Sequence, residues 1–146
     1  MPRFFTLREA RQELPRVGKC IRDACTSKSQ YEESDGAMRS LMQRIMVMGG
    51  ILVDRTVVES IKSQRERSAD RLKSALEEIQ DVGCVVKDLD IGLVDFPTLF
   101  RGEEVYLCWR MDEPDIEFWH GVHEGLQGRK AIDRDFMDHH EGSDPN

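Results

Sequence analysis

The segment VYLCWRMDEPDIEFWH, residues 105–120, holds the densest group of chemically active side chains in the chain. Its cysteine, Cys108, could act as a nucleophile with His120 as its base. The cysteine is expected in the middle of a strand, however, and not at a helix N-terminus, where a thiolate would be stabilised. The residue types therefore favour an inert, half-buried thiol over a reactive one.

His120 follows an apolar run, which is typical of a packing residue held by one hydrogen bond. Imidazole is also a common metal ligand that titrates near neutral pH, so a metal site is the alternative. A helix over residues 116–125 would group four weak metal candidates on or beside one face: Glu117, His120, His123 and Glu124. A ferritin-like di-metal site needs two Glu-x-x-His units on separate helices, and only one is present. Whether residues 116–125 form a strand or a helix stays open.

Aspartates form a third group. Asp88 and Asp90 could bind a divalent cation or work as an acid–base pair. Alternatively, Asp90 could cap a turn. Asp95 interrupts the apolar strand expected at residues 93–96, and a buried charge is costly unless it has a partner. We expect Arg110 or Arg129 to supply that partner.

These residues define one place to look for a ligand, a polar pocket beside Trp109 and Trp119. Its candidate lining residues are Asp90, Asp95, Cys108, Arg110, Glu113, His120 and Arg129. The set forms no complete catalytic constellation and specifies no cofactor. Whether the chain is an enzyme therefore stays open.

Residues 7–83 have the pattern of a long antiparallel helical hairpin. Thr6 and Glu9 match a capping box that starts the first helix. Pro15 either kinks this helix or opens the next one at its first position. The pair Gly49-Gly50 is expected to end the helix.

The second helix has two possible caps, Asp54 and Thr56, and Gly83 closes it. One stripe repeats at close to 3.5 residues, the spacing of coiled-coil-like packing. It consists of Val58, Ile61, Arg65, Ser68, Leu72, Ala75, Ile79 and Val82. We expect this stripe to face the first helix.

A β region follows at residues 84–120, where the period of the sequence changes to two. Pro97 is expected to end its second strand. Together with a C-terminal segment at 121–132, the hairpin and the β region form a single predicted α+β domain spanning residues 1–132, with a small antiparallel sheet. Residues 133–146 are polar and are predicted to be a disordered acidic tail.

Charge and composition limit the partners. Residues 1–83 carry 15 basic and 13 acidic side chains, a balance of +2, whereas residues 84–146 carry 6 and 15, a balance of −9. The acidic part would repel nucleic acid. No apolar run is long enough for a membrane span, and no export signal is visible. The four cysteines form no CxxC pair, so we expect reduced thiols in the cytoplasm.

Three runs of the sequence carry motifs. They are FTLREA with LP (residues 5–10 and 14–15), GCVVKDLDIGLVDFP (83–97), and VYLCWR with EP, WH, Gly125, Gly128 and Arg129. Together they resemble a family of small bacterial proteins catalogued as a conserved domain of unknown function, over residues 4–132. The resemblance implies a helical hairpin before a short β region in a bacterial cytoplasm, and it implies no activity.

The function expected first is a non-enzymatic interaction or assembly module that self-associates through its hairpin as a homodimer or higher homo-oligomer. A two-helix hairpin buries one stripe internally, yet apolar residues near its tip extend around more than one face. They are Met38, Leu41, Met42, Ile45, Met46 and Met48. The alternative is a small enzyme or metal-dependent ligand-binding protein that uses the polar pocket.

Overall fold

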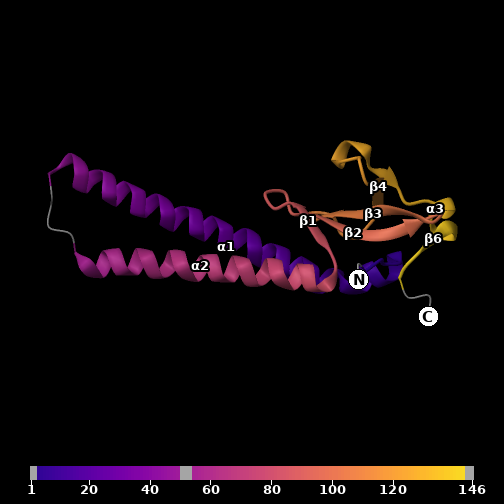
Figure 1. Ribbon diagram of the computed structural model, residues 1–146, viewed down its shortest axis with the longest axis horizontal. Helices are drawn as coiled ribbons and strands as arrows, with labels where there is room; N and C mark the ends of the chain where they lie inside the picture. The colour runs from indigo at the N-terminus through magenta and orange to yellow at the C-terminus, as the bar shows by residue number, and fades with distance from the viewer. Residues whose placement is uncertain (1–2, 50–53, 144–146) are drawn as a thin grey trace. The chain divides into compact units, whose positions relative to one another are not determined.

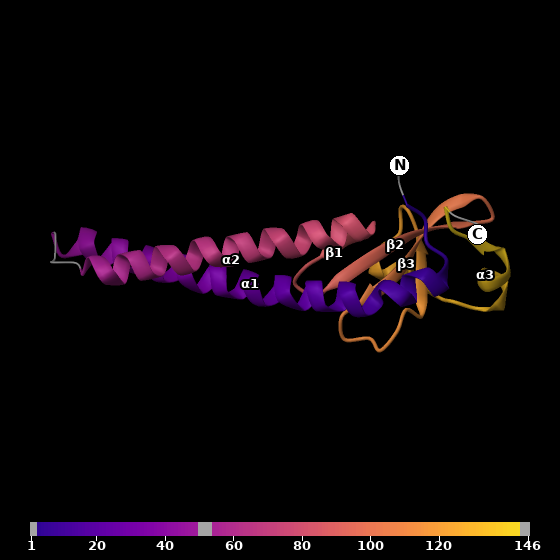
Figure 2. The same ribbon diagram turned by 90° about the horizontal axis from the view of Figure 1, so that it is seen from below.

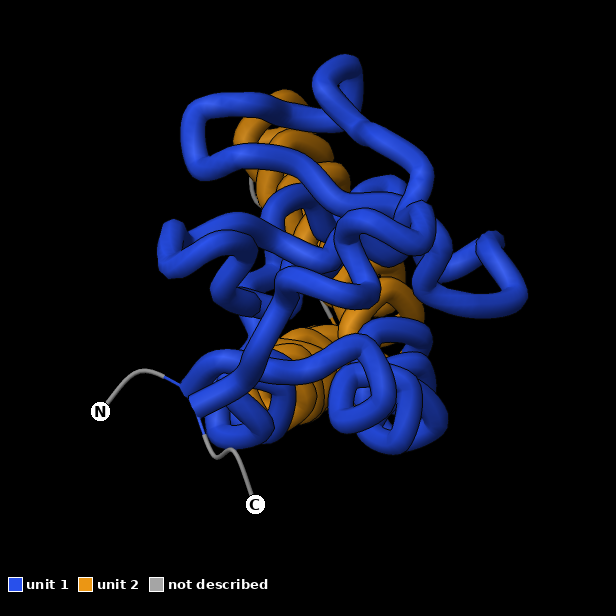
Figure 3. Tube along the Cα trace, turned by 90° about the vertical axis from the view of Figure 1, so that its right-hand side faces the viewer, with its two compact units in different colours: residues 1–22, 76–146 blue, residues 23–75 orange. Residues whose placement is uncertain are grey.

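The computed structural model describes residues 3–49 and 54–143. The chain divides into two compact units: unit 1 contains residues 1–22 and 76–146, and unit 2 contains residues 23–75 (Figure 3). Two long helices run through both units, α1 from Leu7 to Val47 and α2 from Arg55 to Val82 (Figure 1). An antiparallel sheet follows them in unit 1, which confirms the predicted α+β class. No helix among the described residues is both long and apolar enough to cross a membrane.

The predicted signals at the ends of α1 are confirmed. Glu9 N donates to Thr6 Oγ1 at 3.1 Å, and Thr6 N donates to Glu9 Oε1 at 2.9 Å, the reciprocal pair of a capping box. Pro15 lies inside α1, so one helix continues through it. Beyond Val47, Gly49 has a φ of +66°, a left-handed conformation that glycine adopts without steric cost. Gly50 lies outside the described residues.

Of the two possible caps of α2, the structure uses Asp54, whose Oδ1 accepts from Thr56 N at 2.9 Å. All eight residues of the predicted stripe are buried or partly buried. Arg65, within this stripe, pairs with Asp35 of α1 at 3.3 Å. The helix ends before Gly83, which has a φ of +108°. Local sequence signals therefore predict both helices of the hairpin.

The sheet is antiparallel throughout, in the order β1-β2-β3-β4-β5. Figure 2 labels the first three of these strands. Its strands are β1 Val85–Asp88, β2 Leu93–Phe100, β3 Glu103–Arg110, β4 Phe118–Gly121 and β5 Lys130–Ala131. A short β6, His140–Glu141, pairs with the end of β2. The segment left open by the sequence thus contains a strand, β4.

The prediction that Pro97 ends the second strand is wrong, because β2 continues to Phe100. The N–H and C=O of one strand residue point to the same side. The Pro97 carbonyl accepts from Phe5 N at 2.7 Å, outside the β2–β3 ladder, so the missing N–H of the proline also lies away from β3. The proline therefore removes no hydrogen bond between β2 and β3.

One face of the sheet carries the apolar core of unit 1. Val94 and Phe96 of β2 and Leu107 and Trp109 of β3 are all buried, with at most 3% of their surface exposed. They belong to one cluster with a residue before α1, with residues of the N-terminal half of α1 and with residues of the end of α2: Phe5, Leu7, Ala10, Val17, Ile21, Ile79 and Val82. Because strand side chains alternate, the residues between them face the other side of the sheet.

The prediction of a disordered tail is wrong for the residues from 133 to 143. Asp133 Oδ1 accepts from Phe136 N at 2.8 Å and caps a short helix, α3, from Arg134 to His139. Phe136 is 1% exposed, and its ring stacks on that of Phe100 at a centroid distance of 5.0 Å. A single buried aromatic residue therefore anchors a polar segment whose composition favours disorder. Residues 144–146 lie outside the described part of the chain.

Candidate functional site

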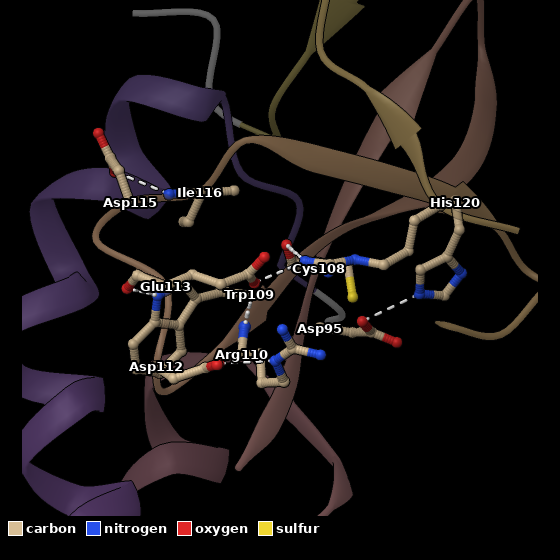
Figure 4. Close-up of polar contacts among 10 residues, drawn as sticks. Asp95, Cys108, Trp109, Arg110, Asp112, Glu113, Asp115, Ile116 and His120 are labelled. Atoms are coloured by element: carbon tan, nitrogen blue, oxygen red, sulfur yellow. Dashed lines mark hydrogen bonds and ion pairs between the residues drawn. The ribbon is translucent and has the colours of Figure 1, made fainter. Parts of the chain in front are cut away.

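Three side chains of unit 1 form a buried polar cluster on the sheet face opposite the apolar core. Asp95 of β2 lies directly across from Cys108 of β3. His120 of β4 lies across from Tyr106, two residues along β3 from Cys108, so alternation puts all three on the same face. Asp95 and Cys108 are 0% exposed and His120 is 3% exposed. Figure 4 shows the three side chains directed toward one another.

The donor atoms of this cluster converge. Asp95 Oδ1 lies 3.0 Å from His120 Nε2, and His120 Nδ1 lies 2.8 Å from the Gly121 carbonyl oxygen. One ligand atom from each of Asp95, Cys108 and His120 lies within 4.8 Å of the other two. Asp95 Oδ2 is buried and has no hydrogen-bond partner among the described residues. The cluster thus offers sulfur, nitrogen and oxygen donor atoms to a ligand. One of the oxygens, Asp95 Oδ2, makes no hydrogen bond among the described residues.

Burial controls the protonation of the cluster. It raises the pKa of the Asp95 carboxyl above its usual value, an effect opposed by His120, by the Cys108 thiol and by Lys87. Burial and the neighbouring Asp95 carboxylate raise the pKa of the Cys108 thiol to about 12. At neutral pH the Cys108 thiol is therefore protonated. His120 Nε2 is hydrogen-bonded to Asp95 Oδ1. This arrangement disfavours a Cys–His nucleophile. Cys108 was expected to be half-buried and is fully buried, and its inertness stays a prediction.

The prediction that Arg110 or Arg129 pairs with Asp95 is wrong. Arg110 Nε pairs at 2.6 Å with Asp112, two residues further along the turn, and Arg129 Nη2 pairs at 2.6 Å with Glu113. Asp95 interacts instead with His120, which lies 25 residues away in the sequence. Both arginines pair with carboxylates in the segment between β3 and β4. The buried carboxylate of Asp95 therefore pairs with His120.

Glu113 and Arg129 form a second polar group next to the cluster. Glu113 Oε1 accepts from Arg110 N at 2.7 Å as well as from Arg129. Arg129 Nη2 also donates to the Cys108 carbonyl at 3.3 Å, and its guanidinium lies 4.2 Å from the centre of the Phe118 ring. The buried ion pair therefore supports the backbone that carries Cys108.

The predicted pocket beside the two tryptophans is not formed as expected. Trp109 and Trp119 belong to the apolar face of the sheet, whereas Asp95 and His120 lie on the opposite face. Asp90 is exposed in the turn between β1 and β2. Of the seven candidate lining residues, the structure groups three directly and places the Glu113–Arg129 pair beside them.

The predicted metal face also fails, because its four residues do not share a helix. Glu117 is exposed directly before β4, and His123 and Glu124 are exposed in the segment after it. Glu124 Oε1 instead accepts from Gly121 N at 2.9 Å and from Lys130 Nζ at 2.7 Å. Of the four predicted residues, His120 alone belongs to the observed cluster, where it lies beside Asp95 and Cys108. The proximity of these two residues to His120 depends on strand register.

A second candidate surface lies on unit 2. Tyr31, Met42 and Met46 of α1 are 36%, 47% and 83% exposed. Together with Asp35 and Arg39 they follow one another at steps of three or four residues, so they share one side of the helix. We call these five residues the outer stripe. One of its members, Asp35, also contacts the buried stripe of α2 through Arg65, and the other four extend the exposed side of α1.

The comparisons with known proteins give one match. A family model described as "Uncharacterized conserved protein (DUF2203)" matches residues 3–132. No curated protein and no solved structure matches significantly. The matched range includes every residue of the polar cluster and of the outer stripe, and it ends before α3.

Proposed function

We propose a function for this chain, which belongs to the family of uncharacterised conserved proteins DUF2203: it is an assembly module that forms a homodimer through the outer stripe of its hairpin. The observation that carries the proposal is the exposure of three large side chains, Tyr31, Met42 and Met46, on one side of α1. Aligned apolar side chains of this size on a monomer surface are typical of an interaction site.

The charges of α1 select a second copy in the antiparallel direction. Residues 23–35 carry four carboxylates and one lysine, a balance of −3, and residues 36–49 carry two arginines and no carboxylate, a balance of +2. Antiparallel packing brings the acidic half of each α1 against the basic half of the other. Opposite charges across an interface fix register and suppress wrong partners.

The outer stripe is also self-complementary about a centre near Ala37. Positions equally far from that centre meet in an antiparallel pair, so Asp35 of one copy approaches Arg39 of the other. Tyr31 likewise comes close to Met42. Within one copy Asp35 and Arg39 already lie 3.4 Å apart, and the dimer joins two such pairs. A two-fold axis repeats each contact and closes the assembly.

The setting proposed for this module is a reducing bacterial cytoplasm. The four cysteines form no disulfide with one another, and three of them are buried. Free thiols are the usual state of cysteine in the cytoplasm, whereas exported proteins form disulfides.

The proposal is tested by sedimentation of variants with glutamate in the apolar part of the outer stripe. The double change Met42→Glu with Met46→Glu places charges in the interface, and we expect the dimer dissociation constant to rise about 100-fold or more. The control is Met137→Glu on α3, because Met137 is 44% exposed and Met42 47%. Circular dichroism verifies that both variants stay helical. Unchanged association of the double variant contradicts the proposed interface.

A charge reversal tests the direction of packing. Arg39→Glu places a carboxylate opposite Asp35 of the second copy and should weaken the dimer most at low salt. Arg44→Glu is the matched control, since Arg44 lies on another side of the same helix and should weaken it less. Equal effects of the two reversals would rule out the antiparallel register.

A further inference from the structure

The donor set of the buried cluster has the composition of a transition-metal site. Cys108 offers a soft sulfur, His120 a nitrogen and Asp95 a carboxylate oxygen. Zinc is bound by these three ligand types, whereas calcium and magnesium take oxygen ligands. We propose that Asp95, Cys108 and His120 bind one divalent transition-metal ion, with zinc as the best match. This inference is independent of the proposed dimer, because all three residues lie in unit 1.

The spacing of the donors suits this ion. Tetrahedral zinc bonds of about 2.0–2.3 Å place neighbouring ligand atoms roughly 3.3–3.8 Å apart. Asp95 Oδ1 and His120 Nε2 are 3.0 Å apart, and one ligand atom from each of the three residues lies within 4.8 Å of the other two. The separations required around zinc lie between this 3.0 Å distance and the 4.8 Å limit, so the spacing of the cluster is compatible with the ion.

His120 is oriented in the way that metal-binding histidines are. Its Nδ1 lies 2.8 Å from the Gly121 carbonyl oxygen, which can only accept a hydrogen bond. A proton on Nδ1 therefore donates to this carbonyl and leaves Nε2 as the nitrogen that can bind an ion. Without an ion, the 3.0 Å contact of Nε2 with Asp95 Oδ1 is a hydrogen bond that holds one further proton. Histidine ligands of metals commonly donate their other N–H to a backbone carbonyl in this manner.

The unused oxygen is the second, independent sign of a ligand. Asp95 Oδ2 is fully buried and accepts no hydrogen bond from any described residue. A buried acceptor left without a partner costs about 1–3 kcal/mol, so native structures rarely contain one without a reason. An ion between the three side chains gives this carboxylate a partner.

The total charge of the three ligands matches that of a divalent ion. The thiolate of Cys108, the carboxylate of Asp95 and a neutral His120 carry a total charge of −2, which one divalent cation cancels. A neutral buried complex avoids the cost of an uncompensated charge. On binding, a metal–sulfur bond forms as the S–H bond breaks, and the ion also displaces the proton of the hydrogen bond between Asp95 and His120 Nε2. Both protons leave to water, so affinity should fall as the pH falls.

Three protein donors leave one tetrahedral position for water or another ligand. Structural zinc sites usually have four protein ligands, and sites with three keep a position available. Arg129 contacts the Cys108 carbonyl at 3.3 Å and brings a positive charge toward the sulfur, which opposes the rise of the thiol pKa. Of the surrounding groups, Arg129 thus favours the thiolate, whereas burial and Asp95 oppose it until an ion is bound.

The test starts with tag-free protein unfolded in a chelator and refolded with an equimolar amount of zinc. Elemental analysis after gel filtration should find about one ion per chain. Cys108→Ser and His120→Gln should each lower the affinity at least tenfold. The matched controls Cys25→Ser and His123→Gln should retain the ion, because both residues lie outside the cluster. Metal-free wild-type protein, or loss of zinc in the controls and not in the cluster variants, would overturn the proposal.

Cobalt provides a readout that does not depend on the folding of any variant. Wild-type chain refolded with cobalt should show the sulfur-to-metal charge-transfer absorption of a cysteine ligand, in a stoichiometric titration. A bound cobalt ion without that absorption would overturn the assignment of Cys108.

Discussion

Arg129 Nη2 lies 2.6 Å from Glu113 Oε1, and each of the two side chains is only 11% exposed. The pair joins the segment before β5 to the turn after β3, and Glu113 also accepts from the backbone of Arg110. By contrast, Arg110 pairs with Asp112, whose side chain is 66% exposed. The structure thus assigns the buried charge pair of the sheet to Arg129.

The first prediction is that Arg129→Ala destabilises the fold much more than Arg110→Ala. Removal of one partner leaves Glu113 buried and uncompensated, and we expect a loss of about 3–5 kcal/mol in the free energy of unfolding. The exposed pair of Arg110 should contribute less than about 1 kcal/mol. Urea denaturation of both variants measures the difference, and equal losses would contradict the assignment.

Thiol reactivity gives the second prediction. Burial raises the pKa of Cys84 from 9.0 to about 12, so its thiol stays protonated at neutral pH, while Cys25 is partly exposed. A thiol-specific reagent at pH 8 should therefore label Cys25 first and Cys84 only on unfolding. Because the folded pKa is raised, the thiol of Cys84 stabilises the fold below pH 9 and loses this contribution as the pH rises toward 12. Fast native labelling of Cys84 would refute its burial.

The third prediction concerns α3. Phe136→Ala removes a ring that packs against Phe100, Trp119 and His140, and should cost about 3–5 kcal/mol. Met137→Ala is the neighbouring control, because Met137 is 44% exposed and its loss should change stability by less than about 0.5 kcal/mol. Thermal unfolding compares them. If the two variants melt alike, α3 does not contribute to the fold.

Two glycines give opposite predictions. Gly36 lies inside α1, and a Cβ there would meet nothing within 4 Å, so Gly36→Ala should stabilise the chain by about 0.5–1 kcal/mol. Gly92 has a φ of +66°, and a Cβ there would lie 2.5 Å from Met111 Cγ. Gly92→Ala should therefore cost about 1–2 kcal/mol or more. Chemical denaturation of both variants checks the two signs.

The hairpin was predictable from the sequence because its signals are local. The capping box at Thr6 and Glu9, the cap at Asp54 and the stop at Gly83 each act within a few residues. The stripe on α2 repeats along one helix, so its period alone indicates which side is buried.

The polar cluster was predictable only as a set of candidates. Asp95, Cys108 and His120 were all identified, but their grouping depends on which residues of three strands lie opposite one another. Register is set by the whole sheet, and a change of one residue would turn each side chain to the other face. The partner of Asp95 was wrong for the same reason, since nearby arginines were assigned without knowledge of the turn that binds them.

The tail was misjudged on composition. Residues 133–143 are mostly polar, and one aromatic residue, Phe136, gives little signal in a windowed average. Tertiary packing orders the segment, as the hydrogen bond from Leu7 N to His140 Nε2 at 3.0 Å also shows. Contacts over such a sequence separation leave no local pattern.

The central claim is that the chain associates with a second copy through the outer stripe, and the most direct test is its mass in solution. Light scattering coupled to gel filtration should give twice the chain mass of 16.9 kDa at micromolar concentration, with a return to the monomer on dilution. Apolar burial together with complementary charges predicts a dimer that weakens in high salt. A mass of 16.9 kDa at every concentration would contradict the account.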